Sequence, residues 1–121
     1  MGFGRGYGGH GGVRRPLRFL AYRLELEDAQ IAELAKILDE IKIERAQAAV
    51  DERRALSSFA DAISGEVFDE AKANSGGALR LQSAERLRGA VLTALARLHR
   101  LLQPEQRERL AYLVRTGTLS F

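Results

Sequence analysis

Apolar side chains recur every three or four residues along most of this chain, the spacing that gathers them on one face of an α-helix. The longest run of this kind extends from Asp28 to about Ile63. Its first half carries the apolar series Ile31, Leu34, Leu38 and Ile41. Further on, the series shifts by one residue, to Ala49, Leu56, Phe59 and Ile63. The shift predicts a long helix that is not one uniform coiled coil.

A second long helix is predicted from about Phe68 to Leu101. Its second half is strongly periodic, with the apolar series Ala84, Leu87, Val91, Ala94, Leu95, Leu98 and Leu101. Its first half contains Asn74–Gly77, where each glycine costs roughly 1 kcal/mol relative to alanine in a helix interior. The sequence therefore predicts a kink, local fraying or a break at Asn74–Gly77.

Two short helices complete the pattern. Pro16 is placed to begin one that runs from Leu17 to about Leu24, because proline suits the first turn of a helix. Pro104 is placed in the same way to begin a last helix, which ends near Arg115. Gly117 follows just past that end, where a glycine commonly closes a helix.

The predicted fold is therefore all-α, with about four helices, two of them long. At 1.5 Å per residue, a helix of about 35 residues extends for about 50 Å. That length favours an elongated antiparallel helical hairpin over a compact globule. Because such a hairpin leaves an apolar face uncovered, we expect a homodimer.

The N-terminal segment differs from the helical body in composition. Residues 1–12 hold seven of the twelve glycines, and so small an apolar content cannot offset the entropy of ordering the chain. We therefore interpret residues 1–15 as a disordered Gly/Arg-rich tail and residues 16–121 as one helical domain. Residues 1–23 contain five arginines and no acid. The basic character thus belongs to the tail, and a nucleic-acid surface extending over the whole fold is not expected.

The same short pattern opens both the first long helix and the last helix. Leu26 is followed four positions later by Gln30, and Leu102 is followed in the same way by Gln106. Gln106 stands at the third helical position, from which its side chain can reach back to the N–H of the capping residue. Each leucine precedes the cap, where an apolar residue can fix the entry of the chain. We take these four residues as a structural motif.

This paired motif resembles the Leu-Thr-x-x-Gln repeats of the Spy/CpxP family, a group of bacterial envelope-stress proteins that includes periplasmic chaperones and zinc- or nickel-responsive relatives. The stretch Phe68–Lys72 is also similar to that family, and the likeness covers roughly residues 16–115. The chain departs from the pattern at Glu27 and Gln103, where threonine is usual. The resemblance implies a cradle-shaped homodimer of helical hairpins. It also implies a non-enzymatic, ATP-independent chaperone or envelope-stress accessory protein.

No catalytic constellation is recognisable, so we do not expect an enzyme and expect no cofactor. The chain has no cysteine and two histidines, His10 and His99. Both are candidate metal ligands, since relatives use histidines for zinc or nickel. A structural or sensing zinc site needs about four ligands, so a dimer would have to pool its residues. A heavy-metal sensor of the same family remains an alternative to the chaperone.

A client-binding face would combine apolar and basic side chains. From their positions along the two long helices, the candidates for it are Arg53, Arg54, Arg80, Arg86, Arg88 and Arg97. The expected partners are partly unfolded proteins or a regulatory protein. A rival interpretation is a regulatory interaction module, whose Arg/Gly tail would bind nucleic acid through charge and stacking.

Two features bear on the compartment. No apolar run approaches the ~20 residues of a membrane span. The glycine-rich start of the chain does not resemble a signal peptide. As written, the chain would therefore stay in the cytoplasm, whereas the family resemblance implies the periplasm.

Overall fold

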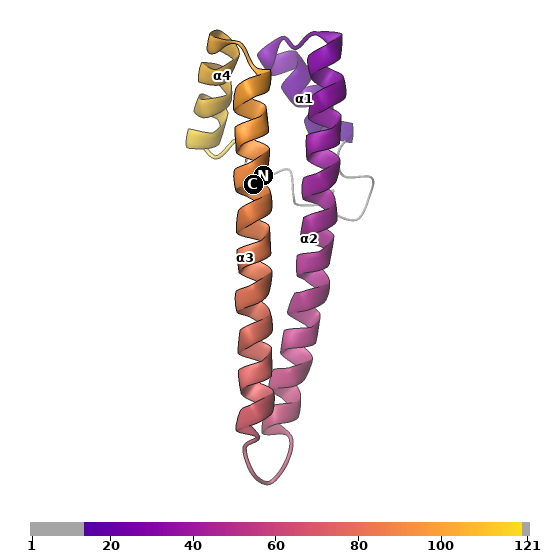
Figure 1. The fold of residues 1–121 in the computed structure, drawn as a ribbon, viewed down its shortest axis with the longest axis vertical. Helices are drawn as coiled ribbons and strands as arrows, with labels where there is room; N and C mark the ends of the chain where they lie inside the picture. Colours follow the sequence, from indigo (N-terminus) through magenta and orange to yellow (C-terminus); the bar gives the residue numbers. More distant parts are fainter. Residues whose placement is uncertain (1–13, 120–121) are drawn as a thin grey trace. The chain divides into compact units, whose positions relative to one another are not determined.

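The computed structural model describes residues 14–119, and every regular element in that range is a helix (Figure 1). The helices are Arg14–Leu24 (α1), Asp28–Ile63 (α2), Glu70–Leu101 (α3) and Pro104–Arg115 (α4). The predicted all-α class is confirmed, and the bounds of α2 and α4 agree with the sequence pattern. α1 begins before Pro16. The expected disorder of the tail and the contacts of His10 lie outside the described residues.

α3 begins two residues later than predicted, because Asp69 acts as its cap. The Asp69 Oδ1 atom accepts a hydrogen bond from the backbone N–H of Lys72, at 3.2 Å. The helix then continues through Asn74–Gly77 without interruption, so the predicted break is absent. Gly76 is buried there. Tertiary packing at this position outweighs the intrinsic preference of glycine against the helix.

The chain divides into two compact units. The first, called here unit 1, comprises Met1–Lys42 and Val91–Phe121, and the second, unit 2, comprises Ile43–Ala90. α2 and α3 each contribute to both units. Among residues 14–119, no helix combines the length and the apolar character needed to cross a membrane.

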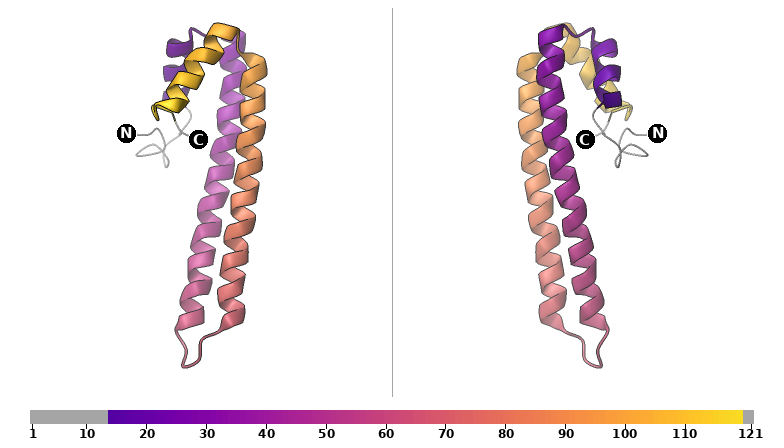
Figure 2. Two further views of the ribbon diagram at one scale, coloured as in Figure 1. Left: turned by 90° about the vertical axis from the view of Figure 1, so that its left-hand side faces the viewer. Right: turned by 90° about the vertical axis from the view of Figure 1, so that its right-hand side faces the viewer.

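Unit 1 contains most of the apolar core. α1 packs against α4 beside the first part of α2 and the last part of α3 (Figure 2). The largest fully buried side chains are Leu24, Leu34, Ile37 and Leu113. Of the two motif leucines, Leu102 is buried and Leu26 is half-buried. The leucines therefore help to anchor the connectors that lead into α2 and α4.

Unit 2 is an antiparallel pair of helix segments, from α2 and α3, joined by residues 64–69 (Figure 1). Its buried positions are occupied by Asp51, Ala55, Ala62 and Gly76. Small residues at a helix–helix contact let two backbones approach closely. The apolar core of this unit is correspondingly thin.

The shift of the seam predicted within α2 is wrong. Buried positions follow one another along the helix at a heptad-like spacing through Ile37, Ile41, Asp51, Ala55 and Ala62. Of the four residues that the shift assigned to the seam, Ala49, Leu56 and Ile63 are exposed, and Phe59 alone is half-buried, beside Gly76. α2 thus has two apolar faces, a buried one and an exposed one, and the pattern that resembles a shift is the overlap of the two.

Candidate functional site

Each Leu-x-x-x-Gln motif begins its helix with the same hydrogen bond. The backbone N–H of Glu27 donates to Gln30 Oε1 at 2.9 Å. At the start of α4, the backbone N–H of Gln103 donates to Gln106 Oε1 at 2.8 Å. The reach of Gln106 back to the capping residue, expected from its spacing, is therefore present. Each glutamine satisfies one of the backbone donors that a helix N-terminus leaves without a partner.

The two motif glutamines also bind each other, although 76 positions separate them. Gln30 Nε2 donates to Gln106 Oε1 at 2.8 Å, and Gln106 Nε2 donates to Gln30 Oε1 at 3.2 Å. The remaining amide hydrogens reach the ends of the preceding helices. Gln30 Nε2 donates to the carbonyl of Leu101 at 3.0 Å, and Gln106 Nε2 donates to the carbonyls of Leu24 and Glu25 at 3.2 and 3.3 Å.

This arrangement has an approximate internal symmetry. The carbonyl of Leu101 immediately precedes the second motif, just as the carbonyl of Glu25 immediately precedes the first. Each glutamine thus caps its own helix and binds the chain that enters the other motif. The pair joins the N-termini of α2 and α4 to the C-termini of α1 and α3. We call these bonds the glutamine junction.

The turn before the first motif has a strained backbone. Glu25 adopts a positive φ of 55°, a conformation that residues other than glycine and asparagine seldom adopt. The N–H of Leu26 donates to the carbonyl of Ala21, and that of Glu25 donates to the carbonyl of Tyr22, at 3.0 and 3.3 Å. Arg109 forms an ion pair with the Glu25 carboxylate at 3.2 Å. These contacts direct the Glu25 carbonyl toward Gln106.

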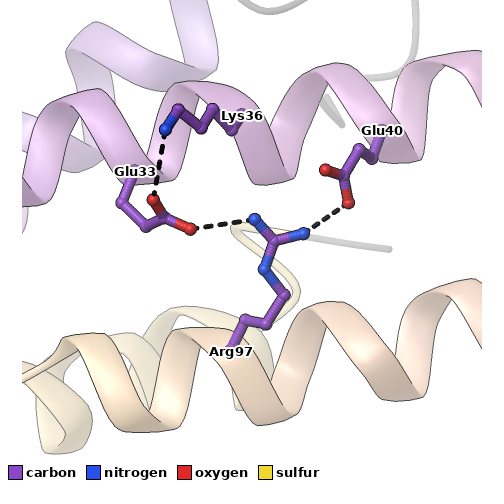
Figure 3. A network of polar contacts seen from close by, with 4 residues as sticks. All are labelled: Glu33, Lys36, Glu40 and Arg97. Atoms are coloured by element: carbon purple, nitrogen blue, oxygen red, sulfur yellow. Dashed lines mark hydrogen bonds and ion pairs between the residues drawn. The ribbon is translucent and has the colours of Figure 1, made fainter.

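A second polar cluster in unit 1 joins α2 to α3 (Figure 3). The guanidinium of Arg97 lies between Glu33 and Glu40, with an Nη2–Oε2 distance of 2.9 Å to Glu33 and an ion pair to Glu40. Lys36 approaches Glu33 from the same helix, at 3.8 Å. The hydrogen bond from Arg97 holds the pKa of Glu33 below its ordinary value of 4.5, against a smaller opposing effect of desolvation. The same bond raises the pKa of Arg97.

In unit 2, Arg80 connects α3 to α2. It forms a two-point contact with Glu52, at 3.0 Å from Nε and 2.6 Å from Nη2. Its guanidinium also lies over the ring of Phe59, at 5.2 Å from the centroid. The hydrogen bond to Glu52 raises the pKa of Arg80. These contacts order a part of the unit that has few large buried side chains.

Four of the six arginines proposed for client binding form ion pairs within the chain. In addition to Arg80 and Arg97, Arg86 pairs with Glu44 at 3.4 Å, and Arg88 pairs with Glu85 at 3.3 Å. The other two, Arg53 and Arg54, are exposed. Within residues 14–119, neither has a carboxylate at ion-pair distance.

Beside Arg53, the outward side of α2 in unit 2 is apolar. This surface, called here the outer face of α2, consists of Ile43, Ala46, Ala49, Val50, Leu56 and Ala60, with Arg53 among them. Ile43 is 65% exposed, Val50 39% and Leu56 51%. This face is not evident from the sequence pattern, because both apolar series of α2 are compatible with a single seam that shifts along the helix. The spacing of Ala46, Ala49, Leu56 and Ala60 was the signal that could have revealed it.

The outer face of α2 is accompanied by a shallow hollow in the same unit. Its volume is about 450 Å³, and it is lined by Arg54, Ser57, Ser58, Ser75, Ala78, Leu79 and Gln82. The hollow arises because small side chains occupy both helices at this height. It provides hydroxyl and amide groups together with Arg54, which has no ion-pair partner among residues 14–119.

Of the candidate metal ligands, His99 is within the described residues. It is exposed in the last turn of α3, and its backbone carbonyl accepts a hydrogen bond from Arg107 Nε at 3.0 Å. Across residues 14–119, no three His, Cys, Asp or Glu side chains are grouped so that they could hold a metal ion. His99 therefore belongs to no group of metal-ligating side chains among the described residues.

The fold and these contacts define a class of all-α protein in which two Leu-x-x-x-Gln motifs, each at the start of a helix, are connected by the glutamine junction. The chain matches the LTXXQ motif family over residues 13–113. It belongs to this family, which is that of the Spy/CpxP-like proteins. No curated protein and no solved structure matches it significantly.

Proposed function

We propose that this chain is an ATP-independent holding chaperone of the Spy/CpxP kind, which acts as a homodimer and performs no catalysis. The observation that carries the proposal is the outer face of α2, where Ile43, Val50 and Leu56 are exposed beside Arg53. Family membership supports the same function, because the LTXXQ family is known for non-enzymatic, chaperone-like proteins.

The energetics of this face suit reversible holding. Full burial of one large aliphatic side chain contributes about 1.5–3 kcal/mol, and association itself costs several kcal/mol. Three such side chains therefore bind a partly unfolded segment weakly enough to release it without ATP. Arg53 and Arg54 lack carboxylate partners among the described residues, so their charges are available to attract acidic clients at longer range.

The thin seam of unit 2 supports the same role. Its buried positions hold alanine, glycine and one carboxylate rather than leucine or isoleucine. A helix pair with so little buried apolar area opens locally at a low free-energy cost. An adaptable pair of helices can fit clients of different shape, which is how promiscuous binding surfaces work.

The proposed homodimer, like the proposed holding activity, rests on apolar side chains that are exposed in the single chain. Large apolar side chains other than those of the outer face are also exposed, among them Leu81 at 74% and Leu92 at 53%. Monomeric proteins seldom leave extended apolar surface uncovered. We propose that a second copy of the chain buries these side chains, because most soluble oligomers are symmetric homo-oligomers.

The proposal is tested by the light scattering of a reduced, aggregating client protein, with and without a stoichiometric amount of this chain and without ATP. We expect suppression of scattering that persists after residues 1–15 are deleted. Suppression that disappears with the tail would instead support the interpretation in which the Arg/Gly segment binds partners. A chain that leaves aggregation unchanged in both forms would refute the chaperone proposal.

A further inference from the structure

The end of unit 2 presents large apolar side chains to solvent. This end, called here the tip, comprises residues 61–70 and includes the connection between α2 and α3 (Figure 1). Ile63 is 73% exposed, Val67 80% and Phe68 57%. Exposed apolar side chains that are rimmed by polar residues commonly mark a surface on which another molecule binds. The tip is therefore a candidate docking surface.

The backbone of the tip is ordered by local hydrogen bonds. The backbone N–H of Asp69 donates to the carbonyl of Ala62 at 3.0 Å. The hydroxyl of Ser64 donates to the carbonyl of Asp61 at 3.3 Å, and Asp69 Oδ1 accepts from the backbone N–H of Lys72 at 3.2 Å. The apolar side chains are thus displayed from a fixed turn, so binding a partner costs little further ordering of the chain.

The charges of the tip are all of one sign, with four acids and no basic residue. Among residues 14–119, none of the four forms an ion pair. Asp69 and Glu70 stabilise the start of α3, where the helix dipole favours negative charge. Asp61 instead lies in the last turn of α2, where the dipole disfavours a carboxylate and no basic residue offsets it. No contact in the described part of the chain accounts for the charges of Asp61 and Glu66, which leaves both available to a partner.

We propose that the tip binds a basic amphipathic segment of another protein, one that carries large apolar side chains beside lysine or arginine. Val67 and Phe68 supply the apolar contact, and Asp61 and Glu66 attract the basic side chains and position them. An acidic rim is repelled by an anionic lipid surface, so charge favours a protein over a membrane as the partner. The inference does not rest on the outer face of α2, on client holding or on the homodimer.

A labelled amphipathic peptide of leucine and lysine is the probe for this surface, and a peptide of leucine and glutamate is its control. Fluorescence anisotropy with the full chain should show binding of the leucine–lysine peptide that weakens as salt is added, and much weaker binding of the control. Because the chain has a formal net charge of +3, its overall charge cannot produce this preference.

Two double variants test the apolar and the charged parts of the tip separately. Val67→Ser with Phe68→Ser removes the apolar contact and should raise the dissociation constant of the leucine–lysine peptide by roughly tenfold or more. Asp61→Asn with Glu66→Gln removes the two charges, so it should weaken binding several-fold and reduce its dependence on salt. All four side chains are exposed, and circular dichroism verifies that each variant keeps its helix content.

Matched controls change exposed side chains outside the tip. Leu92→Ser removes an apolar side chain and Asp39→Asn removes a charge, and both variants should bind the peptide as the native chain does. A second measurement does not depend on a loss of affinity, since the chain has no cysteine of its own. A polarity-sensitive fluorophore on Val67→Cys should shift its emission to the blue when the peptide is added, whereas one on Leu92→Cys should not.

The outcomes separate this inference from the proposed function. Equal binding of the two peptides, or native affinity in both tip variants, would overturn docking at the tip and leave client holding untouched. Peptide binding that is lost only in Val50→Ser with Leu56→Ser would place the peptide on the outer face of α2 and overturn the inference as well. Binding of the chain to neutral phosphatidylcholine vesicles that depends on Phe68 would contradict a protein partner. A chain that holds no client but binds the leucine–lysine peptide at the tip would refute only the proposed function.

Discussion

Gln30 donates its side-chain amide to Gln106 at 2.8 Å, across 76 positions of sequence. The two residues occupy equivalent places in two helix starts, and each binds the backbone that leads into the other motif. The two Leu-x-x-x-Gln motifs therefore form one structural unit, the glutamine junction, rather than two independent helix caps. Within unit 1, the glutamine junction holds the N-termini of α2 and α4 against the C-termini of α1 and α3.

Removal of either motif glutamine should cost more than a single cap. Gln30→Ala and Gln106→Ala each delete several hydrogen bonds worth about 0.5–1.5 kcal/mol apiece, so we expect a loss of about 2–3 kcal/mol in the free energy of unfolding. The double variant should lose less than the sum, by about 1 kcal/mol, because the two side chains share bonds. Urea denaturation measures all three. Gln82→Ala, an exposed residue on α3, is the control.

Additive losses near 1 kcal/mol each, the size expected for a simple cap, would contradict the coupled junction. That result would reduce the two motifs to separate helix starts.

The two adjacent glycines of α3 should respond oppositely to alanine. A Cβ atom on Gly76 would lie 2.7 Å from Phe59 Cε1 and 3.0 Å from the Ala55 carbonyl oxygen, whereas one on Gly77 would meet nothing within 4 Å. We expect Gly77→Ala to stabilise the chain by about 1 kcal/mol through helix propensity. Gly76→Ala should destabilise it by about 1–2 kcal/mol, because the clash exceeds that gain.

Thermal unfolding followed by circular dichroism compares these two glycine variants. Equal stabilisation by both would show that α2 and α3 do not approach closely at Gly76.

The ion pair between Glu33 and Arg97 gives unit 1 a defined pH dependence. The pKa of Glu33 is lowered in the folded chain, so the pair adds stability above the ordinary Glu pKa of 4.5 and loses it as the pH falls through the lower, folded value. At neutral pH, Glu33→Gln should therefore unfold at a lower temperature than the native chain. In acid, the two melting temperatures should converge.

The control is Asp39→Asn, which removes an exposed carboxylate that has no ion pair among the described residues. Its melting temperature should equal that of the native chain at every pH. If the difference in melting temperature between Glu33→Gln and the native chain stays constant as the pH is lowered, the charge of Glu33 is not the source of that difference.

The sequence predicts the helices well because local signals mark their ends. Pro104 and Gln106 define the start of α4, and the positive φ of Gly117 closes it as expected. The pairing of Gln30 with Gln106 could not be predicted, because helix propensity and capping carry no information about contacts 76 positions apart. The continuity of α3 through Gly76 depends likewise on Phe59, a residue from another helix.

The candidate binding surface was only partly predictable. Periodicity identifies the apolar residues of α2 but not which of them face α3, so Leu56 was assigned to the seam and is exposed. Arginines can be counted from the sequence, but their partners cannot. Arg80 and Arg97 are held by carboxylates of α2, which leaves Arg53 and Arg54 as the stronger candidates for contact with clients.

Client binding by the outer face of α2 is tested by measuring how well a chain with Val50→Ser and Leu56→Ser suppresses client aggregation, compared with a chain carrying Leu92→Ser. All three positions are exposed, so each variant should remain folded. We expect the variant with Val50→Ser and Leu56→Ser to need roughly tenfold more chain for half-suppression, because two apolar contacts with the client are lost. The Leu92→Ser variant should match the native chain. Equal activity of both variants would contradict client binding by the outer face of α2.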